Sequence, residues 1–373
     1  MKKFDALIIG GGPAGSSCAI GLAQQGLKVV VVDKSLFPRP KVCGGFIGPQ
    51  SREVLSTFGV WQKLIDKGAQ RIDRSKLVSP NGESVTIPIY EGQALGCSRN
   101  LLDAVLLDRV KEMGVEVLEG AQVRQIFNNG NGFELDIDHY RKNQQHRFYA
   151  THLIDASGHP SPPDKSRHVQ MGIAALYEDM PSARGQVMLY CCPKGHVGIN
   201  PFEGNRVNVC YVVQADLFQE KDCDPQKVLD GWMKDNHGLR ETFEGIKRLT
   251  PWKAVYVPVR KAINLLDKGI WHAGDSAGFI NPVTGGGMSI ALISGQLLAQ
   301  SIVKYDNDQE RLKAYTKSYK QCFFGQRWLA SLWGELAHRP WSAKAVIKLL
   351  NSHDYFKNVS MQQSHPRISM ELI

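Results

Sequence analysis

The sequence lacks three features that would each point to a particular class of protein: a long apolar run, a paired-cysteine motif and a block of basic residues. No stretch reaches the roughly 18 unbroken apolar residues that a helix needs to span a bilayer, so we expect no transmembrane segment. The lysines and arginines behind the net charge of +9 are dispersed along the chain, which argues against a nucleic-acid partner. With 43% hydrophobic and 22% charged residues, the composition is that of a soluble globular protein.

The eight cysteines form no CxxC pair and no cluster with histidine at the spacing of metal ligands, so we predict no metal site. The first residues, MKKF, run directly into a strand pattern without the apolar segment and cleavage site of a signal peptide. We therefore expect free thiols in a reducing, cytoplasmic environment. The neighbouring Cys191 and Cys192 are interpreted as buried strand residues that point to opposite faces of a sheet.

What the sequence does contain begins with a glycine-rich motif between two apolar segments, FDALIIGGGPAGSSCAIGLAQQGLKVVVVDK. Residues 4–9 predict a buried strand, residues 13–26 a helix, and residues 27–32 a second buried strand, which together make a βαβ unit. Asp33 closes the second strand about twenty residues after the glycines, where a carboxylate can accept hydrogen bonds from a ribose.

Three of these glycines fill the pattern GxGxxG, and each has its own role. Gly10 allows the tight turn, Gly12 lets a pyrophosphate approach the backbone, and Gly15 lets the helix pack on the strand. The start of the helix supplies N–H groups and a partial positive charge for phosphates. Strand, helix, strand and terminal acid fall in register, so we predict a dinucleotide site, although this motif alone does not separate NAD from FAD.

Two later segments place positive charge near this site. FPRPKVCGGFIGPQ follows the second strand, contains too many prolines and glycines for a helix, and brings Arg39 and Lys41 beside the phosphates. A helix is expected from about Asn100 to Met113. Arg99 stands at its start, where its side chain can reach toward a pyrophosphate.

Two further segments are strand ends that converge on the same edge of a parallel sheet: HLIDASGH, residues 152–159, and WHAGDSAGFINPVTGGG, residues 271–287. In the second of them, Asp275 is placed to accept hydrogen bonds from hydroxyl groups of the ligand. Gly285 to Gly287 open a helix predicted over residues 288–303 and would point N–H groups at an electron-rich ring edge.

The order of these pieces resembles the flavoprotein superfamily with the p-hydroxybenzoate hydroxylase fold, over about residues 1–310. The resemblance implies non-covalent FAD, with Arg99 at the pyrophosphate, Val123 near the adenine through its backbone, and Asp275 at the ribityl chain. It places Pro282 and the three glycines along the isoalloxazine. The implied cofactor-binding set is Gly10, Gly12, Pro13, Ala14, Gly15, Asp33, Lys34, Lys41, Cys43, Gly44, Arg99, Val123, Asp155, Gly158, Gly274, Asp275, Pro282, Gly285, Gly286 and Gly287.

The expected fold is α/β, with a Rossmann-type FAD-binding domain, an antiparallel substrate sheet and a helical C-terminus. Residues 166–262 interrupt the cofactor segments, and their strand-like runs, with one helical stretch near residues 225–235, predict that sheet. The expected domains are a discontinuous FAD-binding domain at 1–75, 98–165 and 263–310, a substrate-binding sheet domain at 76–97 and 166–262, and a C-terminal helical region at 311–373.

Within the superfamily, the branch of geranylgeranyl reductases and tryptophan halogenase-like proteins is the most similar. PRPKVCGG is similar to a loop of the geranylgeranyl reductases, which lies near the flavin. DASG, GHVGINPFEGNRVNVCYV and NPVTGGGMSIAL resemble the flavoprotein partners of quinoprotein amino-acid oxidases, which are needed to build cysteine tryptophylquinone. The tryptophan-rich GWxWxIP element of the tryptophan halogenases is missing, since residues 196–201 carry no tryptophan.

The leading hypothesis is therefore an FAD-dependent oxidoreductase of monooxygenase type. It would hydroxylate a protein tryptophan during cysteine tryptophylquinone maturation, with the precursor of an amino-acid oxidase as its partner. The alternatives are an isoprenoid reductase of the geranylgeranyl type and a flavin-containing chaperone for a precursor protein. No second GxGxxG is present. Electrons would then come from NAD(P)H that docks transiently, from a reductase partner, or from the substrate.

Two sets of side chains have open roles. Cys43 is a candidate catalytic residue because its loop is expected near the flavin, and packing is the alternative. His159 and His272 flank cofactor turns and receive no role.

After residue 306 a helical pattern carries an aromatic face, which we interpret as core, with a docking surface as the alternative. That face consists of Phe323, Phe324, Trp328, Leu329, Leu332 and Trp333.

Overall fold

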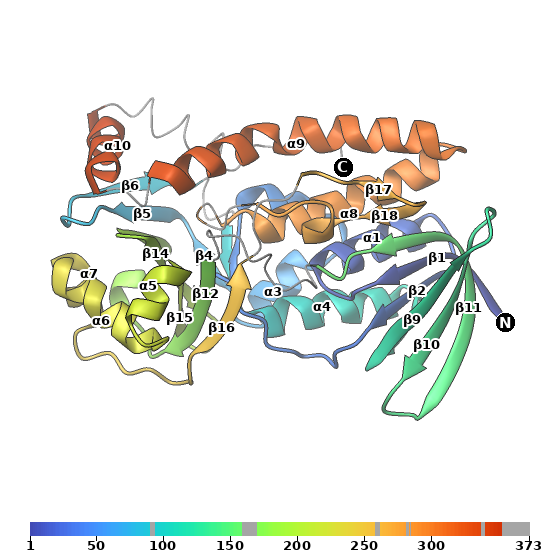
Figure 1. Cartoon of the computed structure of the whole chain (residues 1–373), viewed down its shortest axis with the longest axis horizontal. Coiled ribbons are helices and arrows are strands. Elements are labelled where there is room, and N and C mark those ends of the chain that lie inside the picture. The colour runs from blue at the N-terminus through green and yellow to red at the C-terminus, as the bar shows by residue number, and fades with distance from the viewer. Residues whose placement is uncertain are drawn as a thin grey trace.

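The computed structural model describes residues 1–89, 94–158, 170–257, 262–280, 283, 285–336 and 340–352, apart from the side chains of residues 329–336 and 340–343. Two large sheets lie at opposite ends of an elongated molecule (Figure 1). Helix α9, Asp308–Leu336, runs along one side of both halves. Among the helices within those ranges, none combines the length and the apolar character needed to cross a membrane.

The first sheet is built on the predicted βαβ unit. Strand β1, Lys2–Ile9, pairs in parallel with β2, Val29–Asp33, and with β11, Gln144–Asp155. Strand β2 and residues 6–9 of β1 are apolar runs because both faces of the sheet are covered there, whereas β11 is largely polar before Leu153. Three strands complete the path at its ends: β8, Glu116–Glu119, β17, Leu266–Asp267, and β18, Ile270–His272.

Helices cover one face of this sheet, and an antiparallel excursion covers the other. Strands β9, Ala121–Asn128, and β10, Phe133–His139, fold back on the extended β11. Helix α1, Pro13–Gln24, packs beside α4, Arg99–Glu112, and α8, Gly287–Lys304, on the opposite face. Each helix lies within a residue or two of its predicted range. Gly26, expected to end the first helix, lies just beyond it at a φ of 78°.

The second sheet has seven strands in the order β16-β12-β15-β14-β13-β5-β6. Its neighbours are antiparallel except at β13 and β5, which agrees with the predicted antiparallel-rich sheet. Their bounds are β5 Arg74–Val78, β6 Ser84–Pro88, β12 Gln170–Tyr177, β13 Gln186–Cys192, β14 Gly195–Phe202, β15 Arg206–Gln214 and β16 Lys253–Val257.

The sequence predicted one helix in this half, and the structure contains three. Helix α6, Pro225–Asp235, matches the prediction. Helices α5, Ala215–Glu220, and α7, His237–Phe243, were missed because six or seven residues are too few to show a helical period. All three pack on one face of the second sheet, where Trp232 and Leu239 join its core. Cys192 belongs to this core and Cys191 to the opposite face, which confirms the prediction for the vicinal pair.

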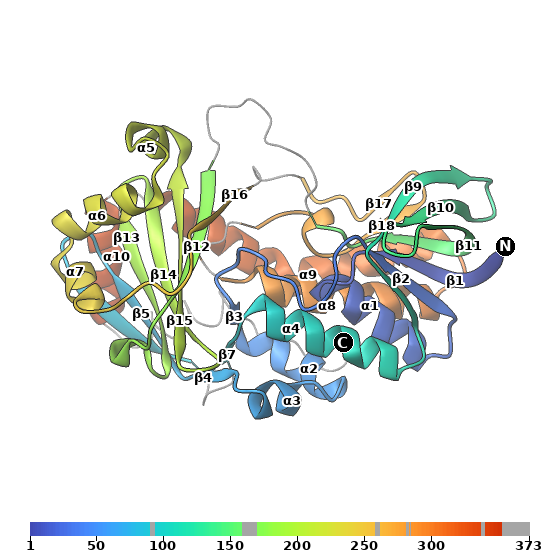
Figure 2. The same ribbon diagram turned by 90° about the horizontal axis from the view of Figure 1, so that it is seen from below.

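A small third sheet joins the two halves. Strand β7, Ala94–Gly96, pairs with β3, Phe46–Ile47, and with β4, Gln70–Ile72. Residues 75 and 76, which were expected to belong to different domains, both lie in β5. Strand β7, which was expected in the substrate-binding domain, belongs to this third sheet and not to the second. Two short helices lie beside this sheet (Figure 2): α2, Arg52–Thr57, and α3, Trp61–Asp66.

The C-terminal region is helical, as predicted, over residues 308–336 and 340–352. Helix α10, Pro340–Ser352, rests on the edge of the second sheet, where Asn351 Nδ2 donates to the Ser84 carbonyl at 3.1 Å. The aromatic face predicted as core divides in two. Phe323 is buried, whereas Phe324 and Trp328 are 72% and 59% exposed, so the core interpretation is wrong for these two. The side chains of Leu329, Leu332 and Trp333 lie outside the described residues.

The close contact between α1 and α8 depends on glycine, and this dependence can be tested. A Cβ on Gly295 would lie 2.3 Å from the Ala14 carbonyl oxygen and 3.0 Å from the Cys18 nitrogen. Because both neighbours are backbone atoms, Gly295→Ala should destabilise the protein by about 1–3 kcal/mol and lower its melting temperature. Gly231→Ala on α6, whose nearest neighbour is the Lys221 Cε at 3.7 Å, is the matched control and should be neutral or stabilising. Equal melting temperatures for the two variants would contradict this packing.

Candidate functional site

The carboxyl ends of four parallel strands meet at one edge of the first sheet. Ile9 pairs with Val32 of β2 and with Asp155 of β11, and Asp155 pairs with His272 of β18. The chain therefore leaves all four strands at the same level, as the sequence predicted. The turns that follow are tied to one another by Gly10 N–H to Val32 O, Ala156 N–H to Ile9 O, and Ala273 N–H to Asp155 O.

The three motif glycines are required for different reasons. Gly10 adopts a φ of 107°, and a Cβ there would lie 2.6 Å from the Ala156 carbonyl oxygen. A Cβ on Gly15 would lie 1.8 Å from the Gly10 carbonyl oxygen. Gly12 differs, because its Cβ would meet only the Nη2 atoms of Arg39 and Arg99, both at 3.5 Å. The protein's own packing thus requires Gly10 and Gly15, whereas the backbone at Gly12 is bare toward two guanidinium groups.

Asp33 is a buried carboxylate at the end of β2. Its Oδ2 accepts from the Gly11 N–H at 2.8 Å and its Oδ1 from the Ser35 N–H at 2.7 Å. Each carboxylate oxygen has a second acceptor position, so Asp33 can hold the glycine turn and still accept from a ribose hydroxyl.

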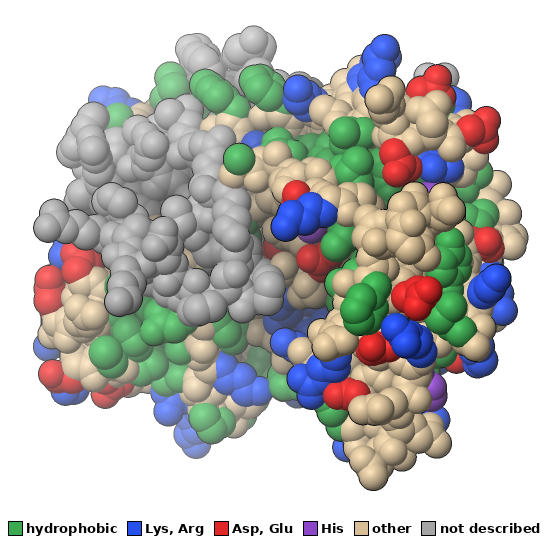
Figure 3. Space-filling view, turned by 45° about the vertical axis from the view of Figure 1, so that its right-hand side comes forward, with side chains coloured by type: hydrophobic (Ala, Val, Ile, Leu, Met, Phe, Trp, Pro, Cys, Tyr) green, Lys and Arg blue, Asp and Glu red, His purple; other side chains and the backbone are tan. Residues whose placement is uncertain are grey.

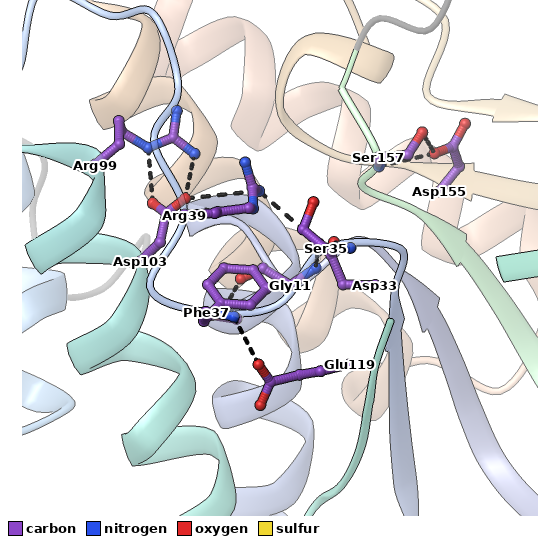
Figure 4. A network of polar contacts seen from close by, with 11 residues as sticks. Gly11, Asp33, Ser35, Phe37, Arg39, Arg99, Asp103, Glu119, Asp155 and Ser157 are labelled. Atoms are coloured by element: carbon purple, nitrogen blue, oxygen red, sulfur yellow. Dashed lines mark hydrogen bonds and ion pairs between the residues drawn. The ribbon is translucent and has the colours of Figure 1, made fainter. Parts of the chain in front are cut away.

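Arg99 and Arg39 share one buried acid, as Figure 4 shows. Arg99 donates from Nε and Nη2 to the two oxygens of Asp103, both at 2.7 Å. Burial acts to lower the pKa of Arg99, but the charge and hydrogen bonds of Asp103 outweigh it, and the net shift is upward. Arg39 Nη2 lies 3.6 Å from Asp103 and 3.8 Å from Asp33. Arg99 is therefore charged and fixed beside Gly12, and Arg39 lies beside the same backbone within ion-pair distance of two acids.

Sequence reasoning had placed Arg39 near the phosphates without counting it as a binding residue, and it missed Asp103. The signal for Asp103 was its position four residues after Arg99 on one helix face.

Lys41 connects this cluster to the later segments. Its side chain is accessible, yet desolvation by the surrounding protein lowers its pKa. The charge of Arg99 lowers the pKa further, and the charge of Asp275 partly offsets both effects. Its Nζ lies 3.5 Å from the position of a Cβ on Gly158. The ammonium of Lys41 is thus exposed to solvent and lies within electrostatic range of Arg99 and Asp275. Figure 3 shows a recess between the two halves of the molecule, with basic and acidic side chains gathered in it.

The last predicted segment lies against the start of α8. Gly274 donates its N–H to Ser294 Oγ at 2.9 Å, and a Cβ there would meet the Ala14 Cβ at 2.9 Å. Asp275 follows in a short 3-10 helix, half-buried and within electrostatic range of Lys41 and Arg99. Gly286 caps α8, and a Cβ on Gly287 would meet no atom within 4 Å in the part of the chain that the structure describes. The end of a long helix is thus bare backbone at this point.

Other predicted residues lie apart from the arginine cluster. Asp155 Oδ1 accepts from the Ser157 N–H and Oγ, and Figure 4 shows this pair away from Arg39 and Arg99. Lys34 is exposed beside the buried Asp33. Val123 lies on β9, half-buried, and packs against the second face of the sheet. His272 Nδ1 lies 3.7 Å from Asp155 Oδ2. Pro282 and His159 lie outside the described residues.

Cys43 is half-buried, and its Sγ accepts from the Gly45 N–H at 3.4 Å. Cys43 also packs against the core of the first half. Its placement is compatible with packing, and no acid or base is found in contact with its sulfur among the described residues.

These features fit FAD. Bare backbone at Gly12 between two fixed guanidinium groups, beside the first turn of α1, suits a pyrophosphate. A Cβ on Gly44 or Gly287 would meet no atom of the described residues within 4 Å, which leaves room among them for a flat ring beside backbone. Lys41 and Asp275 lie between the pyrophosphate end and the ring end of such a site. Fold and site together define a dinucleotide-binding α/β protein.

The chain belongs to the FAD binding domain family, whose profile matches residues 3–323. Two curated relatives are conditioned medium factor receptor 1 from Dictyostelium discoideum, 23% identical over 341 residues, and digeranylgeranylglycerophospholipid reductase from Sulfolobus acidocaldarius, 27% identical over 325 residues. The matches cover 85% and 81% of this chain and 66% and 69% of the relatives, so the chain spans about two thirds of their length.

Solved structures share the fold across nearly the whole chain. A flavin-dependent brominase superposes with a TM-score of 0.83 at 18% identity, covering 99% of this chain and 95% of its own. The p-nitrophenol 4-monooxygenase of Pseudomonas putida superposes with a TM-score of 0.81 at 15% identity, covering 99% and 100%. The p-hydroxybenzoate hydroxylase fold expected from the sequence is thereby confirmed, and the protein is an FAD-dependent oxidoreductase.

The contrast between Gly12 and Gly15 predicts two separable effects. Gly12→Ala should leave the melting temperature of the FAD-free protein unchanged, because its Cβ makes ordinary contacts, but should weaken FAD binding by about tenfold or more. Gly15→Ala should lower both stability and binding, because its Cβ would lie 1.8 Å from a backbone oxygen. Thermal unfolding of the FAD-free protein and fluorescence titration with FAD measure the two effects. Unchanged FAD affinity in Gly12→Ala would show that the cofactor does not approach this backbone.

Proposed function

We propose that this FAD-dependent oxidoreductase is a monooxygenase that hydroxylates a tryptophan side chain of a partner protein. The partner would be the precursor of an amino-acid oxidase whose cofactor is cysteine tryptophylquinone. Bound FAD would supply the oxygen-activating redox chemistry, and the chain would supply binding, orientation and exclusion of water. The observation that carries this proposal is the lining of the second sheet where it faces the FAD-binding half.

The orientation of that face follows from its contacts. The odd-numbered residues of β15, from Val207 to Val213, join the core under α5, α6 and α7. Asn208 and Cys210 therefore point the other way. Asn208 Nδ2 donates to backbone of the Cys43–Gly44 loop, which places this face opposite the cofactor segments.

The centre of the face is small and its flanks are polar. Ala174, Cys210 and Gly198 pair side by side across β12, β15 and β14. His196 and Asn200, on either side of Gly198 along β14, are buried on the same face. Small residues leave space for a bicyclic ring such as indole, and polar neighbours suit its N–H group. An isoprenoid chain would favour a lining without buried amides.

The resemblance of DASG, GHVGINPFEGNRVNVCYV and NPVTGGGMSIAL to partners of quinoprotein oxidases supports the choice of substrate. The shared fold with a nitrophenol monooxygenase supports oxygen insertion into an aromatic ring. We infer that electrons come from transiently docked NAD(P)H or from a reductase partner, because the sequence carries a single GxGxxG.

Reduction of an isoprenoid double bond is the second candidate. The relative from Sulfolobus acidocaldarius is a digeranylgeranylglycerophospholipid reductase, and its similarity extends over 81% of this chain. The KVCGG loop also resembles that branch. The two candidates differ in a measurable way, because only the monooxygenase consumes oxygen.

Co-expression with an amino-acid oxidase precursor tests the proposal. Peptide mass spectrometry should find one added oxygen atom on a tryptophan of the precursor, and none when Gly12→Val replaces the parent enzyme. An unmodified precursor, in cells where the flavin of the enzyme turns over, would contradict the proposal. Saturation of a geranylgeranyl lipid by the reduced enzyme without oxygen would support the second candidate.

The space over the second sheet can be tested by filling it. Among the described residues, a Cβ on Gly198 would have one neighbour, the Cys210 carbonyl oxygen at 3.4 Å, so a larger side chain would project from the face. Gly198→Leu should reduce modification of the precursor by at least about tenfold while the FAD content stays at the parent level. Val197→Leu, on the opposite face of the same strand, is the control for a general effect on β14. Full modification of the precursor by Gly198→Leu would show that the substrate does not occupy this face.

A further inference from the structure

One end of the β14–β15 hairpin contacts two segments that form the cofactor site. Asn200 and Asn208 pair directly across the two strands and are 2% and 4% exposed. Both side chains point away from the core under α5 to α7. They reach a loop more than 150 residues earlier in the sequence, as the separations of 156, 164 and 165 residues show.

The two amides hold the carbonyl groups of this loop. Asn208 Nδ2 donates to the Cys43 oxygen at 3.0 Å and to the Gly44 oxygen at 3.1 Å, and Asn200 Nδ2 donates to the Gly44 oxygen at 3.2 Å. Both acceptors, the Cys43 and Gly44 oxygens, are backbone carbonyls, so only a donor group can serve at these positions. A carboxylate of the same shape would face two acceptors and repel them.

Packing on the same hairpin reinforces these bonds. Gly45 adopts a φ of 72°, and a Cβ there would lie 2.1 Å from the Phe202 ring. A Cβ on Gly96 would lie 2.1 Å from the Pro201 carbonyl oxygen. The backbone of the loop and of β7 therefore lies directly on the end of β14.

The hairpin also supports the helix that carries Arg99. Glu203, at the turn between β14 and β15, accepts from the Ser98 N–H at 3.0 Å and from Ser98 Oγ. Ser98 is the N-cap of α4, and its Oγ accepts from the Leu101 N–H at 3.1 Å. The position of Arg99 is thus tied to the same hairpin as the Cys43–Gly44 loop.

We propose that Asn200 and Asn208 are positioning residues that set the Cys43–Gly44 loop against the cofactor from the substrate side. The loop that carries Lys41 is then held by the substrate sheet as well as by the first half. The inference concerns loop geometry and holds for either candidate reaction. Its consequence is that a change at Asn200 or Asn208 alters the surroundings of the flavin, whereas the helix that carries Arg99 is held separately through Glu203.

The variants Asn208→Asp and Asn200→Asp test this inference in the FAD-loaded protein. The matched control is Asn236→Asp, which also loses a buried amide donor, to the Ser79 carbonyl at 3.0 Å, but lies at α7 away from the loop. Two readouts are needed: the alkylation rate of Cys43 by iodoacetamide, followed by peptide mass spectrometry, and the visible absorption and circular dichroism of the bound flavin. Alkylation of the buried Cys192 is the internal measure of global opening.

Loss of the amide donors should raise Cys43 alkylation by about tenfold or more and change the flavin spectrum, with Cys192 alkylation and FAD stoichiometry at the level of the control. A merely structural role would raise Cys192 and Cys43 alkylation together and leave the spectrum unchanged, which would overturn the proposal. Equal Cys43 alkylation in all three variants would also overturn it. If Asn208→Asp does not fold, Asn200→Asp, which removes one of the three bonds, decides the question by the same readouts.

Discussion

The register among four parallel strands is the constraint on which the site depends. Ile9 stands level with Val32 and Asp155, and Asp155 stands level with His272. Four segments that are far apart in the sequence consequently turn away from the sheet at one edge. A shift of one residue in any of these pairs would reverse its side chains and separate its turn from the others. The glycines at positions 10 and 15 permit the close contacts that this register imposes.

Charge is distributed to suit an anionic cofactor, with buried acids beside two of the three basic groups described at the site. Asp103 is fully buried and holds Arg99 by two hydrogen bonds, and Arg39 lies near both Asp103 and Asp33. A buried acid of this kind holds the guanidinium groups in place by charge-assisted hydrogen bonds and ion pairs. A solvent-exposed cation would have no such restraint. The net charge of +9 therefore says little about this site. Three basic groups described there, Arg39, Arg99 and Lys41, face the cofactor position, and the two arginines lie beside acids.

The second sheet contacts segments of the first half that form the cofactor site. The end of the β14–β15 hairpin contacts the Cys43–Gly44 loop through Asn200 and Asn208, and the start of α4 through Glu203. These side-chain contacts tie the second sheet directly to the cofactor segments. This arrangement offers a physical route by which a bound substrate and the flavin affect each other.

The sequence by itself determined the βαβ unit, the ligand edge and the family, because local glycine spacing and apolar strands specify them without distant partners. The spacing of four residues between Arg99 and Asp103 was a signal for their pairing, but it could not show that Asp103 is buried. The sequence also could not determine that Arg39 lies beside Gly12, because this contact joins distant segments, or that α5 and α7 exist, because such short helices show no period. It also could not decide that Phe324 and Trp328 face solvent while Phe323 is buried. Tertiary structure alone decided the contact between the asparagines and the Cys43–Gly44 loop. Residues some 160 positions apart leave no joint pattern in the sequence, and only folding brings their donors and acceptors together.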